Sequence, residues 1–196
     1  MFSGIIEKIG TVKSKNEHSL VIESEFISKI SEISESICVS GACLTIINKS
    51  QNSFSVNVVE ETISRTNLGL LLKGSNVNLE SSLKLGGKIG GHMVQGHIDC
   101  TAKIESISKK SSSWDIKLEK PKNISRYIIE KGFICIDGAS LTITHSDESS
   151  FNVVVIPYTW ENTIFSGYEV GTVVNLEVDM TAKYIENFMA YKTGQG

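Results

Sequence analysis

The second half of this chain repeats the first. Residues 41–46 read Gly-Ala-Cys-Leu-Thr-Ile, and residues 138–143 read Gly-Ala-Ser-Leu-Thr-Ile, a shift of 97 positions. The same shift carries Val-Asn-Leu-Glu at residues 77–80 onto residues 174–177. Two copies are too few for a solenoid, whose stacked units number at least about three. The repeat therefore predicts a duplicated domain, and two similar domains offer two similar pockets.

A second repeated element opens each half and helps to divide the chain. Gly-Ile-Ile-Glu at residues 4–7 answers Gly-His-Ile-Asp at residues 96–99, with a shift of 92 positions. Residues 86–91 read Gly-Gly-Lys-Ile-Gly-Gly, which is too flexible for the interior of a helix or strand, so we interpret them as a linker. The predicted division is a first domain over residues 1–90, a second over residues 91–180 and a tail over residues 181–196.

Composition agrees with two small domains and argues against several classes of protein. The 196 residues are 40% apolar and 21% charged, so each half can bury a core. The net charge is −3 and the basic residues are scattered, which predicts no surface for nucleic acid. No apolar run reaches the roughly 20 residues of a membrane span, and the first residues lack the features of a signal peptide. We expect a cytoplasmic protein with no nucleic-acid or membrane partner.

The spacing of apolar residues is that of strands. Residues 114–119, Trp-Asp-Ile-Lys-Leu-Glu, alternate apolar and polar side chains, as a half-buried strand does. Residues 54–58 and 77–80 alternate in the same way, and their counterparts in the second half are more apolar. Short strands separated by Gly, Ser and Asn predict a small closed barrel in each half, which leaves no exposed sheet edge.

The tail has no counterpart in the first half and has the pattern of a helix. Tyr184, Ile185, Phe188 and Met189 fall on one helical face, and Thr181 is a candidate N-cap. Such a face either packs against its own domain or contacts another subunit. The sequence leaves both alternatives open.

The cysteines and histidines predict no metal site. The four cysteines form neither a Cys-x-x-Cys pair nor a zinc-ribbon spacing. His92 and His97 lie five positions apart among glycines, which disfavour a helix, and the sequence offers no evident third ligand. We therefore expect chemistry without a bound metal.

Comparison of the two copies singles out residues of chemical interest. Cys43 lies within the repeated Gly-x-x-Leu-Thr element, where the second copy has Ser140, so both copies keep a small nucleophile or hydrogen-bonding group. His97 stands where the first copy has the apolar Ile5, and Asp179 follows the last repeated strand. A lone histidine is often structural, and an aspartate at a strand end often forms a turn or cap. Neither residue identifies an activity by itself.

Taken together, the motifs resemble riboflavin synthases of the alpha-chain type. The resemblance covers the chain from Met1 to about Tyr191 and is carried by five elements. They are Met-Phe-Ser-Gly-Ile-Ile-Glu at residues 1–7, Gly-x-Cys-Leu-Thr at 41–45, Glu-Thr-x-x-Arg-Thr-Asn-Leu-Gly at 61–69, Ile-Gly-Gly-His-x-x-Gln-Gly-His-Ile-Asp at 89–99, and Lys-Gly-Phe-x-x-Ile-Asp-Gly-x-Ser-Leu-Thr at 131–142. One such element is weakly specific, whereas all five in order are typical of this family.

The resemblance implies an all-β protein with two tandem six-stranded Greek-key barrels, related by pseudo-two-fold symmetry, and a C-terminal helix that assembles a homotrimer. It implies a transferase that acts on two molecules of 6,7-dimethyl-8-ribityllumazine. One molecule donates a four-carbon unit to the other, which gives riboflavin and 5-amino-6-ribitylamino-uracil without a metal or other cofactor. The site would lie between the first barrel of one subunit and the second barrel of its neighbour, and lumazine synthase is a further partner to be tested.

Carried over residue by residue, the resemblance places catalytic positions in both halves. They are Phe2, Ser36 and Cys43 in the first barrel and His97, Lys131, Ser140, Thr142 and Asp179 in the second. Our hypothesis is that His97 transfers protons and that Cys43 and Ser140 polarise or add to the lumazine ring. Asp179 would orient a neighbouring donor.

Substrate contacts carry over in the same way, with main-chain amides reading the uracil-like edge and polar side chains meeting the ribityl hydroxyls. In the first copy they are Gly4, Ile5, Ile6, Cys43, Leu44, Thr45, Asn57, Val58, Val59, Glu60, Glu61 and Thr62. In the second copy they are Gly96, His97, Ile98, Lys131, Ser140, Leu141, Thr142, Val154, Val155, Ile156, Pro157, Tyr158 and Thr159. Pro157 and Tyr158 replace Glu60 and Glu61, so the two pockets cannot treat the ligand identically.

A second class of protein shares the expected fold. Lumazine-binding optical proteins bind one lumazine or flavin tightly and do no chemistry, so we expect them to lose the second pocket and its polar groups. In this chain Cys43, His97, Lys131, Ser140 and Asp179 are all present, which favours the enzyme. Ser40 and Ala42 depart from many relatives, but both are small and predict only a modest change of pocket shape.

Overall fold

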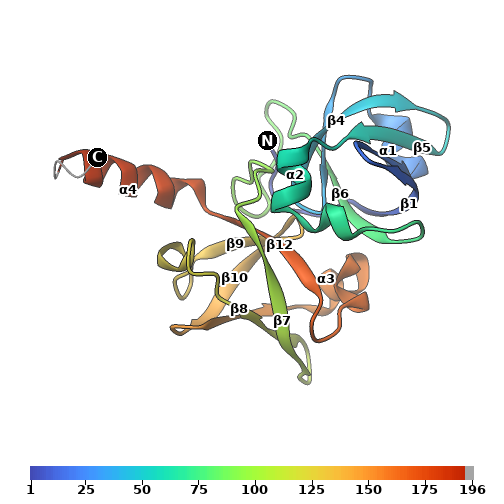
Figure 1. Ribbon diagram of the computed structural model, residues 1–196. Coiled ribbons are helices and arrows are strands. Elements are labelled where there is room, and N and C mark those ends of the chain that lie inside the picture. The colour runs from blue at the N-terminus through green and yellow to red at the C-terminus, as the bar shows by residue number, and fades with distance from the viewer. Residues whose placement is uncertain (193–196) are drawn as a thin grey trace.

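The chain forms two closed antiparallel β-barrels and a helix that extends away from them (Figure 1). This arrangement comes from a computed structural model, which describes residues 1–192. The predicted all-β fold with a C-terminal helix is confirmed. The last four residues of the predicted tail, 193–196, lie outside the described part of the chain. The division of the chain at residue 90 stays a prediction.

The first barrel is built from six strands in the order β1-β2-β5-β4-β3-β6, with β6 closing onto β1. Because β2 lies beside β5 while β3, β4 and β5 pair in sequence, the topology is the predicted Greek key. The strands are β1 (Lys8–Asn16), β2 (Ser19–Glu23), β3 (Ser36–Val39), β4 (Ala42–Lys49), β5 (Ser53–Asn57) and β6 (Asn76–Ser81), with the helical segments α1 (Glu25–Ile30), α2 (Glu60–Arg65) and η1 (Asn67–Leu70) between them.

The second barrel repeats this topology, with β8 beside β11 and β12 pairing with both β7 and β9. Its strands are β7 (Cys100–Lys109), β8 (Trp114–Glu119), β9 (Phe133–Ile136), β10 (Ala139–Ser146), β11 (Ser150–Val155) and β12 (Val173–Val178), and its helical segments are η2 (Ser125–Tyr127), α3 (Pro157–Asn162) and η3 (Ile164–Gly167). The final helix α4 (Met180–Lys192) follows β12 directly.

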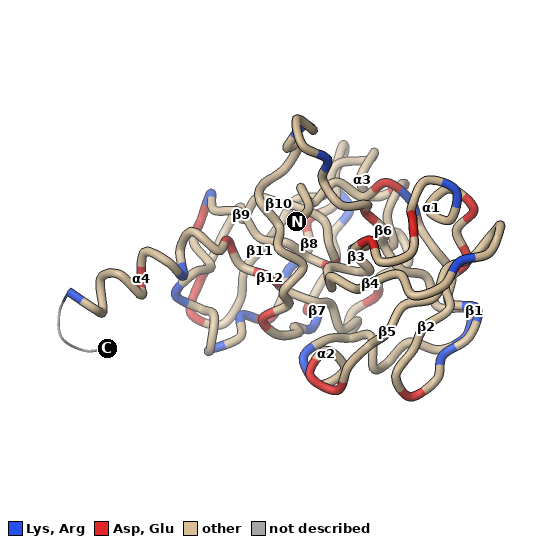
Figure 2. The backbone as a smooth tube through the Cα atoms, turned by 90° about the horizontal axis from the view of Figure 1, so that it is seen from above, with Lys and Arg blue, Asp and Glu red and all other residues tan. Residues whose placement is uncertain are grey.

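Each barrel has its own apolar core, produced by the strand alternation that the sequence predicts. Phe54 of the first barrel and the equivalent Phe151 of the second are both fully buried. Burying side chains of this size stabilises each barrel by about 1.5–3 kcal/mol per residue. Acidic and basic residues are dispersed over both barrels (Figure 2), and within residues 1–192 no helix is long and apolar enough to cross a membrane.

The two barrels are joined by segments that cross from one half of the chain to the other. We call residues 2–7 crossing segment 1 and residues 94–99 crossing segment 2. Ile98 of segment 2 lies in the core of the first barrel, and Ile6 of segment 1 packs against the core of the second. Phe2 and Val94 pair as an isolated antiparallel bridge, with hydrogen bonds of 2.8 and 3.1 Å. Each half therefore completes the barrel of the other half.

The pseudo-two-fold axis passes between two glycine turns. Gly41 and Gly138 have φ values of 88° and 86°, and a Cβ added to Gly41 would lie 2.9 Å from the Gly138 nitrogen. Only glycine allows this backbone conformation and this close approach without strain. Asn78 donates to the Asp137 carbonyl at 2.9 Å, and Asn175 donates to the Ser40 carbonyl at 2.7 Å. The repeated Asn of Val-Asn-Leu-Glu thus fixes each barrel to the other.

The start of α4 differs in one detail from the sequence prediction. The Asp179 Oδ1 atom accepts a hydrogen bond from the Thr181 N–H at 2.9 Å, so the side-chain acceptor at this helix start is Asp179. Thr181, the predicted N-cap, lies inside the first turn. An aspartate at a helix N-terminus is favoured because it accepts from an otherwise unpaired N–H and opposes the helix dipole.

Candidate functional site

A pocket of about 330 Å³ lies at the first barrel, and we call it the Cys43 pocket. Cys43 and Thr62 come from the first half of the chain, whereas Gly96, His97 and Ile98 come from crossing segment 2. The Cys43 N–H donates to the Gly96 carbonyl at 2.8 Å, so the two walls are hydrogen bonded together. The sequence assigned His97 to the second barrel, but the structure places it beside Cys43 of the first.

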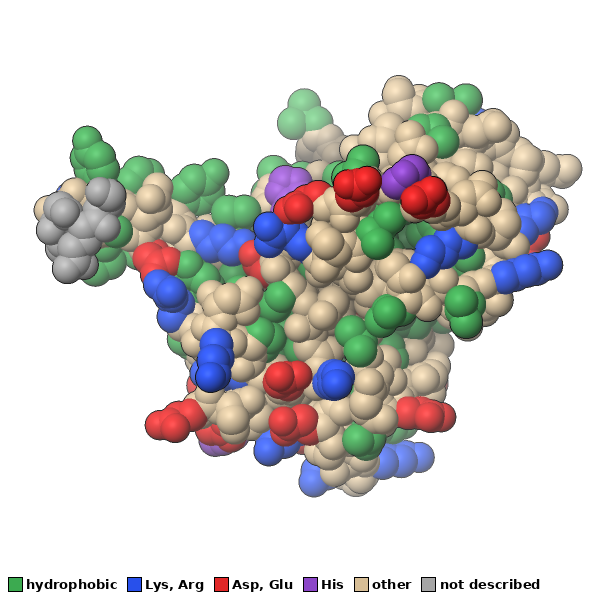
Figure 3. All heavy atoms as spheres, viewed as in Figure 1, with side chains coloured by type: hydrophobic (Ala, Val, Ile, Leu, Met, Phe, Trp, Pro, Cys, Tyr) green, Lys and Arg blue, Asp and Glu red, His purple; other side chains and the backbone are tan. Residues whose placement is uncertain are grey.

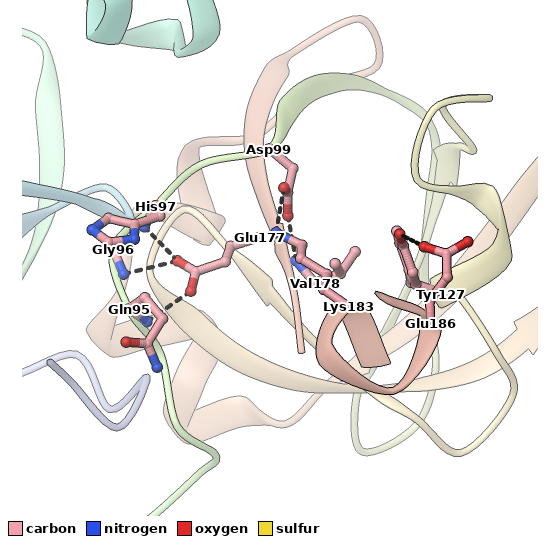
Figure 4. A network of polar contacts seen from close by, with 9 residues as sticks. All are labelled: Gln95, Gly96, His97, Asp99, Tyr127, Glu177, Val178, Lys183 and Glu186. Carbon is pink, nitrogen blue, oxygen red and sulfur yellow. Dashed lines mark hydrogen bonds and ion pairs between the residues drawn. The ribbon is translucent and has the colours of Figure 1, made fainter. Parts of the chain in front are cut away.

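Crossing segment 2 is held by a buried carboxylate. Glu177 of β12 accepts hydrogen bonds from the main-chain N–H groups of Gln95, Gly96 and His97, at 2.7, 2.9 and 3.0 Å (Figure 4). Burial raises the pKa of the Glu177 carboxyl to about 7, and these hydrogen bonds oppose that rise. The His97 side chain itself is exposed and free to meet a ligand.

Helix α4 contributes a cation to the rim of the Cys43 pocket. Lys183 lines the pocket and forms an ion pair with Asp99, whose Oδ2 accepts from the Val178 N–H at 3.0 Å. One turn further, Glu186 pairs with Arg126. Glu186 also accepts a hydrogen bond from the Tyr127 hydroxyl (Figure 4). These contacts fix the first turns of α4 on the second barrel while Lys183 faces the first.

A second hollow of about 500 Å³ adjoins the Cys43 pocket along the end of β5 and the start of α2. It is lined by Asn57, Val58, Val59, Glu60 and Glu61, and Glu61 also lines the Cys43 pocket. The structure therefore brings the predicted first-copy contacts at residues 57–62 next to Cys43. The predicted contacts Gly4, Ile5 and Ile6 do not join them, because crossing segment 1 lies at the second barrel.

The equivalent position in the second barrel is built around Ser140, and we call the group of residues Gly91, His92, Phe133, Ser140 and Asp179 the Ser140 site. The Ser140 N–H donates to the Gly4 carbonyl at 2.8 Å, which mirrors the Cys43–Gly96 contact. His92 Nδ1 lies 2.6 Å from Ser140 Oγ, and its ring stacks on Phe133 with centroids 5.1 Å apart. The end of the linker, at Gly91, thus lies against Ser140, and the next residue, His92, is the histidine partner.

His92 is the residue of the Ser140 site for which the sequence predicted no role. Burial lowers the pKa of the His92 imidazole, and the negative charge of Asp179 partly offsets that effect. A neutral imidazole can take a proton from the Ser140 hydroxyl. The available signal was its place in the Gly-Gly-His motif at residues 90–92, where the linker ends, but sequence spacing could not show that this motif folds onto residue 140.

The other predicted catalytic residues have different surroundings. Lys131 is exposed in a turn with a φ of 64°, and its N–H donates to the Ile143 carbonyl at 2.8 Å. Thr142 is also exposed and pairs with Phe133 across β9 and β10. Ser36 starts β3, where its carbonyl accepts from the Ser82 hydroxyl at 2.6 Å. Phe2 is fully buried with Cys38, Val94 and Cys135, so its side chain packs between the barrels.

Several predicted ligand contacts have side chains that point into the barrel cores. Leu44, Val58, Leu141 and Val155 are all buried core residues, which leaves only their main chain for a ligand. Other predicted contacts are open to solvent. These are Ile5, Thr45, Val59 and Glu60 in the first half and Thr142, Ile156, Pro157 and Tyr158 in the second, while Val154 and Thr159 are half-buried.

The polar contacts between the barrels are not symmetric. Asp137 accepts hydrogen bonds from Asn67 Nδ2 at 3.0 Å, the Asn175 N–H at 2.8 Å and the Tyr168 hydroxyl at 2.5 Å. Burial raises the pKa of the Asp137 carboxyl to about 6, against the effect of these donors. The equivalent residue in the first copy is Ser40. This network borders a cavity of about 540 Å³ between the barrels, away from both Cys43 and Ser140.

The polar residues do not converge as metal ligands would. Within residues 1–192, no group of three or more His, Cys, Asp or Glu side chains is placed to hold a metal ion. The reactive groups are instead the Cys43 thiol with His97 in the Cys43 pocket and the Ser140 hydroxyl with His92 in the Ser140 site.

Comparison with known proteins identifies the class that this fold and these pockets define. The family described as lumazine binding domain matches twice, over residues 3–82 and 95–179, which are the two barrels with their crossing segments. The chain is similar in structure to LumP complexed with riboflavin, with a TM-score of 0.83 and 24% identity over 91% of this chain and all of that one. The protein is therefore a duplicated lumazine-binding double barrel.

Its full-length relatives narrow the class. The riboflavin synthase of Actinobacillus pleuropneumoniae is 40% identical, covering 98% of this chain and 91% of its own length. That of Bacillus subtilis (strain 168) is 41% identical over 96% and 90%, and that of Schizosaccharomyces pombe is 37% identical over 96% and 94%. The chain belongs to the riboflavin synthase family.

Proposed function

We propose that the protein is a riboflavin synthase, a transferase that converts two molecules of 6,7-dimethyl-8-ribityllumazine into riboflavin and 5-amino-6-ribitylamino-uracil. The observation that carries the proposal is that both barrels keep reactive polar side chains at equivalent turns, Cys43 with His97 in the Cys43 pocket and Ser140 with His92 in the Ser140 site. A protein that only binds one lumazine needs one such site. The reaction needs no further reactant, because the four carbons gained by one lumazine are those lost by the other.

In this proposal each barrel binds one lumazine. The adjoining hollow next to the Cys43 pocket offers Glu61 and Thr62 to the hydroxyls of a ribityl chain. The amides of Cys43 and Ser140 are already donated to Gly96 and Gly4, so other main-chain groups must read the ring edge. Thr45, Thr142 and Lys131 are exposed and can contact a ring that lies over the pocket.

The chemistry divides between the two histidines. The C7 methyl group of the donor lumazine must lose a proton, and His97 at the Cys43 pocket is the proposed base. The acceptor lumazine must be attacked at C7. Ser140 Oγ adds there while His92, at 2.6 Å, takes up the hydroxyl proton, and Asp179 stabilises the imidazolium that forms. Stacking the two rings supplies the proximity that carbon–carbon bond formation requires.

We further propose that the protein assembles as a homotrimer in the cytoplasm. The exposed face of α4 carries Tyr184, Ile185 and Phe188, each more than half exposed. Figure 3 shows hydrophobic side chains along the projecting helix. Burying such a face against neighbouring copies would remove it from water. In this trimer we place the site between the first barrel of one subunit and the second barrel of the next. Association with lumazine synthase stays a prediction.

The direct test is to mix the purified protein with 6,7-dimethyl-8-ribityllumazine and follow the absorbance of riboflavin. More than one riboflavin per chain supports the synthase. A tight spectral shift without product would instead indicate a lumazine-binding optical protein of the same fold. The oligomeric state is measured separately by light scattering, and a monomer would contradict the trimer.

A further inference from the structure

Two buried glutamates, Glu80 at the end of β6 and Glu177 at the end of β12, hold the two crossing segments. We propose that they are positioning residues with crossed targets. Glu177 of the second barrel positions the residues of the Cys43 pocket of the first, and Glu80 of the first barrel positions those of the Ser140 site of the second. The role in turnover rests on the proposed function, whereas the crossed positioning itself does not.

Glu177 determines the path of crossing segment 2. Its side chain is almost fully buried, and its two oxygens accept from the three successive N–H groups of Gln95, Gly96 and His97 (Figure 4). Three main-chain donors converging on one carboxylate fix both the position and the rotation of that short segment. The orientation of the His97 side chain follows from the rotation of its own peptide.

The fixed segment is then fitted directly against Cys43. The Gly96 carbonyl accepts from the Cys43 N–H at 2.8 Å, and a Cβ added to Gly96 would lie only 2.5 Å from the Cys43 Cβ. Such tight packing transmits a displacement of the segment to the thiol instead of absorbing it. Glu177 therefore sets the position of His97 relative to Cys43, although it belongs to the opposite barrel.

Glu80 holds crossing segment 1 at the Ser140 site in the same way. It accepts from the Ser3 N–H at 2.7 Å, the Ser3 hydroxyl at 2.9 Å and the Gly4 N–H at 3.0 Å. The Gly4 carbonyl accepts from the Ser140 N–H at 2.8 Å, and the Ser3 carbonyl accepts from the His92 N–H at 3.2 Å. Through crossing segment 1, Glu80 thus positions both members of the Ser140–His92 pair.

The charge of these glutamates distinguishes them from ordinary packing residues. Among the ion pairs of residues 1–192, none includes Glu80 or Glu177. Burial raises the pKa of both carboxyls, so keeping them inside without a cation has a free-energy cost. Both copies nevertheless have this residue in the same place. An acceptor that can satisfy several N–H donors at once explains the choice, because a glutamine offers only one acceptor oxygen.

The experiment uses the full chain with Glu177→Gln and Glu80→Gln, and Glu7→Gln as a control. Glu7 also accepts from a main-chain N–H, that of Ser81, but it is exposed. The readout is the set of histidine side-chain resonances in NMR spectra of the protein without ligand. His97 reports on the Cys43 pocket and His92 on the Ser140 site, while the exposed His18 and His145 serve as references.

We expect Glu177→Gln to shift the His97 resonance and leave His92 in place, and Glu80→Gln to shift His92 and leave His97 in place. With lumazine as substrate, each variant should lower kcat roughly tenfold, since small displacements of reacting groups cost at least that much. Glu7→Gln should leave both histidines and kcat unchanged. A variant that shifts the histidine at its own barrel, both histidines equally, or neither would overturn the proposal.

A second measurement applies if either variant fails to fold. In the wild-type protein, the amide resonances of Gly96 and Cys43 should follow one pH midpoint, that of Glu177, while Ser140 does not follow it. Independence of the Cys43 amide from that midpoint would overturn the proposal. Both measurements work without turnover, so absence of riboflavin formation by the wild type would remove the proposed function and leave the crossed positioning testable.

Discussion

In the Cys43 pocket the thiol faces a histidine from crossing segment 2 and a lysine from α4. In the Ser140 site the hydroxyl contacts His92, which follows the linker directly, and crossing segment 1 carries the apolar Ile5 at the position equivalent to His97. The backbone turns that carry Cys43 and Ser140 are nevertheless equivalent, down to the N–H that each donates to a glycine carbonyl.

The difference arises from the segments that follow the last strand of each half. After β6 the chain continues as the glycine-rich linker, and Gly91 comes so close to Ser140 that an added Cβ would lie 2.5 Å from the Ser140 Cβ. After β12 it continues as α4, whose Lys183 lies at the Cys43 pocket. Each segment thus borders the site of the other barrel. The two copies have equivalent backbone turns, whereas the segments that follow them, the linker and α4, differ. The two sites therefore differ as well.

Neither half of the chain contains a complete site. Each site combines a turn from one barrel with a crossing segment from the other half. A substitution in one half should therefore change the site of the other.

The largest effects are expected from alanine at the crossing glycines. Gly4 and Gly96 have φ values of 74° and 81°, and an added Cβ would lie 2.5 Å from the Cβ of Ser140 and of Cys43. Gly4→Ala and Gly96→Ala should each lower the free energy of unfolding by about 3 kcal/mol, from backbone strain and overpacking together. Denaturant unfolding measures this.

Gly74→Ala is the matched control for these two variants. Gly74 has a φ of 91° but nothing within 4 Å of an added Cβ, so only the backbone cost of about 1 kcal/mol remains. Equal losses for Gly74→Ala and Gly96→Ala would show that the close approach to Cys43 contributes nothing.

The effects of alanine variants on kcat should distinguish the roles of His92 and His97. His92→Ala should lower kcat about 100-fold, as expected for loss of a base that activates a hydroxyl. Ser140→Ala should cost a similar factor, and the double variant should lose little more, because the two side chains act as one unit. Rates of riboflavin formation give all three values.

His97→Ala provides the contrast, since it belongs to the other pocket. In the double variant with Ser140→Ala, the factors by which the two substitutions lower kcat should multiply, because the two residues share no hydrogen bond. If the kcat losses of His92→Ala and Ser140→Ala multiplied in the same way in their double variant, the 2.6 Å contact between the two side chains would have no role in the reaction.

The asymmetric contact between the barrels should give a pH dependence. The folded-state pKa of Asp137, about 6, lies above its ordinary value of 3.8, so the folded protein binds this proton more tightly than the unfolded chain. The contribution of Asp137 to stability is therefore present below about pH 4 and is lost as the pH rises through about 6. Asp137→Asn should remove roughly 3 kcal/mol of this pH-dependent change in unfolding free energy, about 1.4 kcal/mol for each pKa unit.

Tyr168→Phe sharpens the same test. The Tyr168 hydroxyl donates to Asp137 and lowers the pKa of that carboxyl, so removing the hydroxyl should move the midpoint to higher pH. Unfolding curves recorded from pH 4 to 8 give both results. An unchanged pH profile in Asp137→Asn would contradict the assignment.

The smallest effect concerns the cation at the rim of the Cys43 pocket. Lys183→Met keeps most of the length of the side chain but removes its charge, and we expect KM to rise about fivefold with kcat little changed. Lys192→Met, on the exposed end of the same helix, should have no effect. An equal rise in KM for both variants would remove Lys183 from the pocket.

The sequence determined the fold because its signals are local or repeated. The alternation in residues 114–119 appears as β8, and the repeated Gly-x-x-Leu-Thr element appears twice as the turn into a strand, β4 and β10. Such patterns depend on which side chains a pleated strand buries, and this can be read from neighbouring residues. The family resemblance rests on the same linear motifs.

The tertiary structure alone decided which residues share a site. In the sequence, His97 belongs to the second copy and Ile5 to the first, and nothing local indicates that their segments exchange barrels. The exchange depends on contacts between distant residues, such as Gly96 with Cys43, Gly4 with Ser140 and Ile98 in the first core. The contact between His92 and Ser140 also depends on packing between residues that are distant in the sequence. Periodicity specifies which face of a strand is buried, but only closure of both barrels specifies what each turn meets.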